Sequence, residues 1–251
     1  MKSMKKMTKG RKRKANKTIR IILSVVIAAM VIGLGLVIFS VGANALRSDC
    51  PESIREFVRK YPEAISLAEN FSDNAERDVE MALSDDDMTE EVPLLIQWDK
   101  RWGYYWYGDD YFGTNGCGPT CMAMVYAALT RDRTWSPARF GEWADSNGYY
   151  WDGSGTAWSF MTDGAEKLGL TVQEISMTET ALQQASDEGS PVICNVGPGV
   201  FTKGGHYIVI AGFYEDGTLR INDPNSPERS SRHWIIDEFK DQVRAAWKYK
   251  Y

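Results

Sequence analysis

The chain has little of the two side chains that most often ligate transition metals and build covalent frameworks. Only two of its 251 residues are histidines, and four are cysteines. Four cysteines in a chain of this length give no disulfide framework, and Cys117 and Cys121 lack the second, correctly spaced pair that a zinc site needs. The stretch Asp145 to Gly148 begins like a calcium loop but lacks the distal glutamate. We therefore expect no metal and no cofactor.

Positive charge is scarce outside the first 20 residues. These hold ten of the 29 Lys and Arg and no acid, which leaves 19 basic residues against 34 acidic ones in the rest of the chain. A domain of this charge repels polyanions, so we expect no nucleic-acid partner.

Long apolar runs are also absent, with one exception. No charged residue occurs from Ile21 to Leu46, and about 20 helical residues suffice to cross a bilayer. The run predicts a transmembrane helix over 21–46, and its basic flank places the N-terminus in the cytoplasm and the rest of the chain outside. Ala43-Asn44-Ala45 resembles a signal-peptidase site, so secretion after cleavage near Ala45 is the alternative.

Four segments follow from these shifts in composition. Between Pro51 and Leu83 apolar residues recur in short helical patterns broken at Pro62, and Ser84 to Glu91 is strongly acidic. We expect this part to act as a spacer, with inhibitory covering of a substrate cleft as the alternative. The predicted division is a basic cytoplasmic tail (1–20), a transmembrane helix or uncleaved signal anchor (21–46), a helical stalk with an acidic linker (47–91) and a globular domain (92–251).

A nucleophile is indicated at Cys117, within Asn115-Gly116-Cys117-Gly118-Pro119-Thr120. The glycines allow a tight bend, Pro119 suits the first turn of a helix, and the apolar residues that follow recur at helical spacing. Cys117 is thus predicted at a helix N-terminus, where the macrodipole favours thiolate over thiol. For an arbitrary cysteine, burial as a small packing residue is the commoner role, and we expect that role for Cys121 and Cys194.

Three other residues supply what a nucleophilic thiol needs. His206 opens the apolar run 206–211 after two glycines, and Asp223 ends a strand that returns through Asp216-Gly217, a strong hairpin signal. The amide of Gln97 lies upstream and can donate to an oxyanion. His233 follows a polar stretch and is expected at the surface.

The hairpin register tests whether His206 and Asp223 can meet. A flat ladder places Asp223 opposite Ile210, on the same face as His206 but about 13 Å along the strand. A bend is therefore required, and Gly212 is a plausible place for it. Asn222 projects to the opposite face, and Asn225 is a weaker candidate for the same role.

Together these motifs resemble a known family. The chain from about Glu91 to Tyr251 is similar to the stand-alone, C39-like relatives of the bacterial papain-like cysteine peptidases that process double-glycine leaders. The resemblance is carried by Gln97-Trp98-Asp99, Gly116-Cys117-Gly118-Pro119-Thr120-Cys121, Gly205-His206-Tyr207-Ile208-Val209 and Asn222-Asp223-Pro224.

The resemblance implies roles for four residues. Cys117 becomes the nucleophile, His206 the general base and acid, Asp223 the group that orients the imidazole, and Gln97 the oxyanion donor. In the transporter-linked members the glutamine is closer to the cysteine than the twenty residues found here. The sequence also contains no nucleotide-binding domain, so we expect no exporter, and the substrate does not follow from the resemblance.

The fold class expected is α+β, with helices first and strands later. Helices are predicted after Cys117, from Ser136 to near Gly148, over 157–168, over 180–188 and near 237–245, and strands at 192–196, 206–213 and 219–222. The resemblance adds a papain-like arrangement, in which the nucleophile helix packs against an antiparallel sheet that carries His and Asp.

We therefore expect a membrane-anchored, extracellular cysteine peptidase that acts on a peptide or protein through an acyl-enzyme. A cell-wall peptide hydrolase or transpeptidase shares the same order of residues. A catalytically idle binding domain on the same fold is the alternative outside the enzymes.

Overall fold

The computed structural model describes residues 49–251. The predicted basic tail and transmembrane helix lie outside the described residues. Among residues 49–251, no helix is both long enough and apolar enough to span a bilayer.

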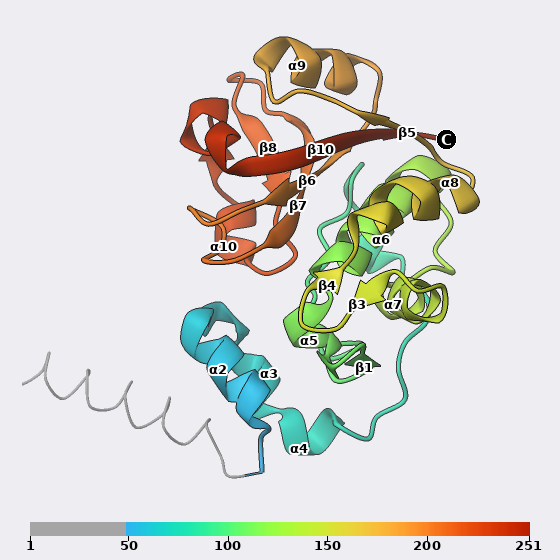
Figure 1. Cartoon of the computed structure of the whole chain (residues 1–251), viewed down its shortest axis with the longest axis vertical. Coiled ribbons are helices and arrows are strands. Elements are labelled where there is room, and N and C mark those ends of the chain that lie inside the picture. Colours follow the sequence, from blue (N-terminus) through green and yellow to red (C-terminus); the bar gives the residue numbers. More distant parts are fainter. Residues whose placement is uncertain (1–48) are drawn as a thin grey trace, which may run out of the picture. The chain divides into compact units, whose positions relative to one another are not determined.

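The first half of the globular domain is helical (Figure 1). Its longest helix, α6, starts directly after Gly116, has Pro119 in its first turn and ends at Arg131, which adopts a left-handed conformation with φ of 58°. Ser136 caps the next helix by accepting a hydrogen bond from the Arg139 N–H. The elements of this half are β1 (Trp106–Tyr107), β2 (Asp110–Tyr111), α5 (Phe112–Asn115), α6 (Cys117–Thr130), α7 (Pro137–Ser146), β3 (Tyr150–Trp151), β4 (Gly155–Thr156), a π-helical turn (Phe160–Gly164) and α8 (Ala165–Lys167).

The second half is an antiparallel sheet with strand order β5-β10-β6-β7-β8-β9. In the central strands β6 and β7 alternate residues enter two different cores, because Ile193 and Val209 pack toward the helices and Cys194 and Ile208 pack on the other face. The elements of this half are β5 (Thr171–Glu174), α9 (Glu179–Asp187), β6 (Val192–Val196), β7 (His206–Phe213), β8 (Leu219–Asn222), α10 (Pro227–Ser230), β9 (His233–Trp234) and β10 (Val243–Lys250). The α+β class and the antiparallel sheet are confirmed.

One predicted element is wrong. The helix expected near 237–245 is instead two 3-10 turns, Ile236–Glu238 and Lys240–Gln242, followed by strand β10. β10 pairs with both β5 and β6, so its Ala and Lys residues form a central strand despite their low strand propensity. Tertiary pairing on both edges and burial of Trp247 and Tyr249 outweigh that propensity.

The segment before the family-like region is also folded. It consists of α2 (Glu52–Lys60), a 3-10 turn (Pro62–Ala64), α3 (Ile65–Glu69) and α4 (Phe71–Asn74). Its apolar residues form a third core with Tyr104 of the helical half. The acidic stretch is attached as well, because Arg101 forms an ion pair with Asp87 at 2.7 Å. A spacer role alone does not account for this packing.

Candidate active site

Cys117 is the first residue of α6 and is partly exposed. The turn around it is tightly packed: a Cβ on Gly118 would lie 2.7 Å from the Thr156 side chain of β4. Gly118 therefore lets the β3–β4 hairpin approach the first turn of the helix. The N–H groups of that turn lack intrahelical acceptors, so they are free to face a negative charge at the sulfur or at a bound oxyanion.

His206 is the first residue of β7 and is buried together with Asp223. The Nε2 atom of His206 lies 2.8 Å from Oδ1 of Asp223. An ionised carboxylate only accepts, so this contact assigns the proton to Nε2 and leaves Nδ1 for another partner. The Cys117 sulfur lies in the same cavity and raises the pKa of the ring, so it is the candidate for that partner.

Asp223 is held from several directions. The Nε of Arg229 donates to its Oδ2 at 2.6 Å, and the Asn225 N–H donates to its Oδ1 at 2.8 Å. Its own N–H donates to the Ser230 hydroxyl at 2.9 Å. Arg229 and Ser230 both belong to α10, so this short helix fixes the carboxylate toward His206.

The predicted bend at Gly212 is confirmed. The β7–β8 register shifts between Ile210 and Gly212, and Gly212 has a φ of +134°. Asn222 consequently pairs with Val209, which brings Asp223 level with Ile208, two residues from His206 instead of four. Two residues correspond to about 7 Å along the strand, a gap that the two side chains close.

The neighbouring asparagines have other functions. The Asn222 amide donates to the carbonyls of Val92 and Pro93 at 3.0 and 3.1 Å, which ties the start of the domain to β8. Asn225 contacts Asp223 through its backbone and is not the imidazole's partner.

Gln97 lies in the same cavity as Cys117 and His206. Its Nε2 donates to the Gly113 carbonyl at 2.9 Å and more weakly to the Thr114 carbonyl at 3.3 Å. The opposite amide orientation would point Oε1 at these two carbonyls, so the donor orientation is the favourable one. The side-chain amide is thus engaged by two carbonyls, while the Gln97 backbone N–H anchors the loop on Pro224 at 2.8 Å.

The electrostatics of the site favour a charged imidazole. Burial by itself lowers the pKa of His206, but the Asp223 carboxylate and the Cys117 sulfur outweigh burial and raise this pKa to about 10. Burial also works against ionisation of Asp223, yet His206 and Arg229 lower its pKa below the usual range. Because this pKa is higher in the folded than in the unfolded state, where it is about 6.5, protonated His206 contributes to the stability of the fold. The contribution is complete below about pH 6.5 and is lost as pH rises toward 10. Because the pKa of Asp223 is lower in the folded state, the ionised carboxylate also contributes to stability. This contribution is complete above about pH 3.9 and is lost as pH falls further.

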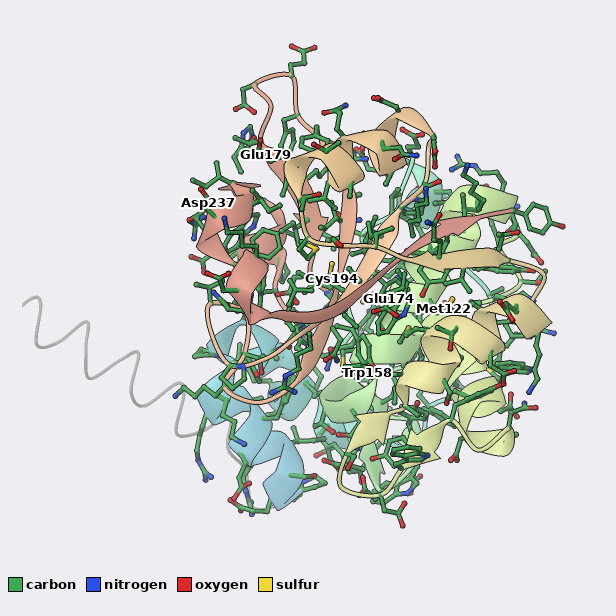
Figure 2. All side chains as sticks on the ribbon, turned by 45° about the horizontal axis from the view of Figure 1, so that its top comes forward. Met122, Trp158, Glu174, Glu179, Cys194 and Asp237 are labelled. Atoms are coloured by element: carbon green, nitrogen blue, oxygen red, sulfur yellow. The ribbon has the colours of Figure 1, made fainter. Side chains whose placement is uncertain are left out.

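The remaining thiols and the second histidine lie elsewhere. Cys50, Cys121 and Cys194 are buried, and Figure 2 shows Cys194 among the strands, inside the molecule. Burial raises the pKa of all three thiols. His233 is exposed, as expected, and its Nδ1 lies 2.8 Å from Asp216.

The cavity at Cys117 measures about 470 Å³ and has a wall that the sequence analysis did not predict. Gln97, Cys117 and His206 line it together with Ser53, Phe57 and Lys60 of α2. A larger hollow of about 850 Å³ between α9 and the β7–β8 hairpin is lined by neither cysteine nor histidine. Within residues 49–251, no group of three His, Cys, Asp or Glu side chains is arranged to hold a metal ion.

Comparison with models of protein families gives a match over most of the described residues. The model of the Peptidase_C39 like family matches residues 89–251. A structural match is the crystal structure of the peptidase domain of Streptococcus ComA, a bi-functional ABC transporter involved in a quorum sensing pathway. It shows 24% identity and a TM-score of 0.43, and the match covers 55% of this chain and 92% of that one. The comparison with curated proteins found no match.

The burial pattern predicts selective alkylation. In the folded protein at pH 7, iodoacetamide should label Cys117 faster than Cys50, Cys121 or Cys194, because only Cys117 is partly exposed and beside an imidazole. Peptide mass mapping over a time course measures this, with urea-unfolded protein as the control in which all four react. Equal rates in the folded protein would contradict the assignment of Cys117 as nucleophile.

The raised pKa of His206 predicts a titration that NMR can follow, since only two histidines contribute imidazole signals. We expect the His206 ring to stay protonated at neutral pH and to titrate near pH 10. His233→Gln assigns the signals. Asp223→Asn should move the His206 titration to lower pH, because the variant keeps the Arg229 cation and loses the carboxylate charge. An unchanged titration in Asp223→Asn would show that the carboxylate does not act on the ring.

Proposed function

The chain belongs to the Peptidase_C39 like family, and from the arrangement of Cys117, His206 and Asp223 we propose that it hydrolyses peptide bonds as a cysteine peptidase. The observation that carries the proposal is one cavity lined by a partly exposed thiol at a helix N-terminus and by a buried imidazole, which contacts a buried carboxylate at 2.8 Å. A nucleophile, a base and an orienting carboxylate in this order are the groups that acyl transfer uses.

In the first half of the reaction the Cys117 sulfur attacks the carbonyl carbon of the scissile bond. The carbonyl π electrons move to oxygen and give a tetrahedral intermediate. When these electrons return, the C–N bond breaks and His206 transfers the proton on Nδ1 to the departing amine. The products of this half are the free amine and a thioester on Cys117.

In the second half His206 acts as a base. Its Nδ1 takes a proton from water, and the hydroxide attacks the thioester carbonyl. Collapse of the second intermediate expels the Cys117 sulfur, which recovers the starting pair, and releases the carboxylic acid. Throughout, the Asp223 carboxylate accepts the hydrogen bond from the Nε2–H of His206 and so keeps the ring in its orientation.

The negative oxygen of both intermediates needs donors. The backbone N–H groups of the first turn of α6 are one source. The Gln97 amide is the other, provided that it exchanges its weaker contact with the Thr114 carbonyl for the oxyanion. This gives Gln97 the role of oxyanion donor, consistent with its place in the cavity wall.

The place of action proposed is the outer face of a cell membrane, with the N-terminus cytoplasmic and residues 21–46 as a single anchor. Support comes from the charge pattern: ten basic residues and no acid precede an uncharged run long enough to span a bilayer. The alternative, cleavage near Ala45, gives a secreted form of the same domain.

Hydrolysis by the full-length protein tests the proposed activity. A diverse peptide library and purified peptidoglycan should reveal a cleaved substrate, and Cys117→Ala should abolish cleavage while leaving the melting temperature near that of the wild type. Cleavage that persists in Cys117→Ala would locate the activity elsewhere, and products in which a second peptide replaces water would indicate a transpeptidase.

Gln97→Ala should retain alkylation of Cys117 but lower kcat by about 10²–10³.

The proposed topology predicts accessibility from outside. Protease added to intact cells should degrade residues 49–251, and a cytoplasmic marker protein should stay intact as the control. Protection of the domain until the cells are lysed would contradict export. A mature N-terminus at Leu46 would replace anchoring with secretion.

A further inference from the structure

Helix α2 lines the catalytic cavity although it precedes the family-matched residues 89–251. Its contribution is one helical stripe, Ser53, Glu56, Phe57 and Lys60, which follow the spacing i, i+3, i+4 and i+7. A peptide that reaches Cys117 and His206 through this cavity therefore passes side chains of α2.

The wall is fixed to the helical half of the domain. The Ser53 hydroxyl donates to Oδ1 of Asp110 at 2.7 Å. Farther along, the Leu67 side chain packs where glycine leaves room, within 3.1 Å of the Cβ position of Gly103 and 2.8 Å of that of Gly113. A larger side chain at either glycine would push the segment away.

The same segment is fixed to the sheet half. The hydroxyl of Tyr61 lies 3.3 Å from that of Thr202. The Glu63 carboxylate accepts hydrogen bonds from the Ser226 hydroxyl and from the Glu228 N–H at the start of α10, the helix that holds Asp223. Attachment to both halves makes α2 a permanent wall of the cavity.

One end of this wall is basic. Lys60 and Lys203 both line the cavity, and each is next in sequence to a member of the Tyr61–Thr202 contact. Both are exposed, and within residues 49–251 neither forms an ion pair. The Arg244 guanidinium adds a third cation, 3.9 Å from the Cβ position of Gly205 on the loop before His206.

Two acids also line the cavity, as many as the two lysines, so the basic character is local to the end of the stripe at Lys60. Asp110 is at the other end of the stripe, where the hydroxyls of Ser53 and Thr114 already donate to it. Glu56 lies one turn before Lys60 on the same face and moderates the potential there.

We propose that α2 is a specificity-determining wall of the active site, and that Lys60 and Lys203 select peptides with an acidic side chain close to the scissile bond. The proposal rests on the proposed peptidase function for its substrate, but the charge of the cavity can be measured without any substrate.

The first test compares two small reagents on full-length protein. In each, the Cys117 sulfur displaces iodide and forms a C–S bond, but iodoacetate is an anion and iodoacetamide is neutral. At Cys117, the iodoacetate rate divided by the iodoacetamide rate should be about threefold to tenfold lower in Lys60→Gln/Lys203→Gln than in wild type. The difference between the two proteins should be smaller in high salt. The control is Lys240→Gln, which removes one positive charge from a lysine paired with Asp237 outside the cavity, and each single variant, Lys60→Gln or Lys203→Gln, matches it in charge.

The second test compares matched fluorogenic peptides that differ in one Glu or Lys beside the cleaved bond. Wild type should prefer the Glu peptide by kcat/KM, the double variant should lose this preference, and Glu56→Gln should increase it. No peptide cleavage by wild type would contradict the proposed function and leave the reagent ratio to decide the inference. An unchanged reagent ratio, or an unchanged preference in an active double variant, would overturn the inference.

Discussion

The contact between His206 and Asp223 is the constraint on which the rest of this structure depends. Both side chains are buried, and a buried carboxylate is costly unless a cation and hydrogen-bond donors compensate it. Asp223 receives both, from the Arg229 guanidinium, the Asn225 N–H and the imidazole itself. The same compensation keeps the imidazole protonated beside Cys117, so the pairing that stabilises the fold also prepares the proposed nucleophile.

This contact is maintained by elements distant in sequence. The bulge at Gly212 brings the end of β8 near the start of β7, and α10 presents Arg229 and Ser230 to the carboxylate. Glu63 of the N-terminal segment holds the start of α10. The segment before the family-matched region thus supports the orienting carboxylate as well as lining the cavity.

The sequence predicted the local features of the site well, because they depend on nearest neighbours and strand periodicity. The helix at Cys117 followed from glycine and proline signals, and the choice of Asp223 over Asn222 followed from side-chain alternation.

Features that depend on long-range packing were missed. β10 contains Ala and Lys residues of low strand propensity and is a strand because it pairs on both edges. The segment that forms the α2 wall was expected only as a spacer or cover. The contact of Arg229 with Asp223 was not predicted, because Arg229 lies six positions after Asp223 and α10 brings the two together. The stripe at i, i+3, i+4 and i+7 in α2 was a usable signal, but nothing local specified what it faces.

The central claim is that Cys117 carries the acyl group of a cleaved peptide. Rapid acid quenching of the full-length enzyme during turnover of a cleavable peptide, followed by mass spectrometry of the proteolytic fragment that contains Cys117, measures this directly. The account predicts a mass increase on that fragment equal to the acyl half of the substrate, enriched in Asp223→Asn if deacylation becomes slow, and absent in Cys117→Ala. Turnover without acylation of Cys117, or an acyl group on another residue, would contradict it.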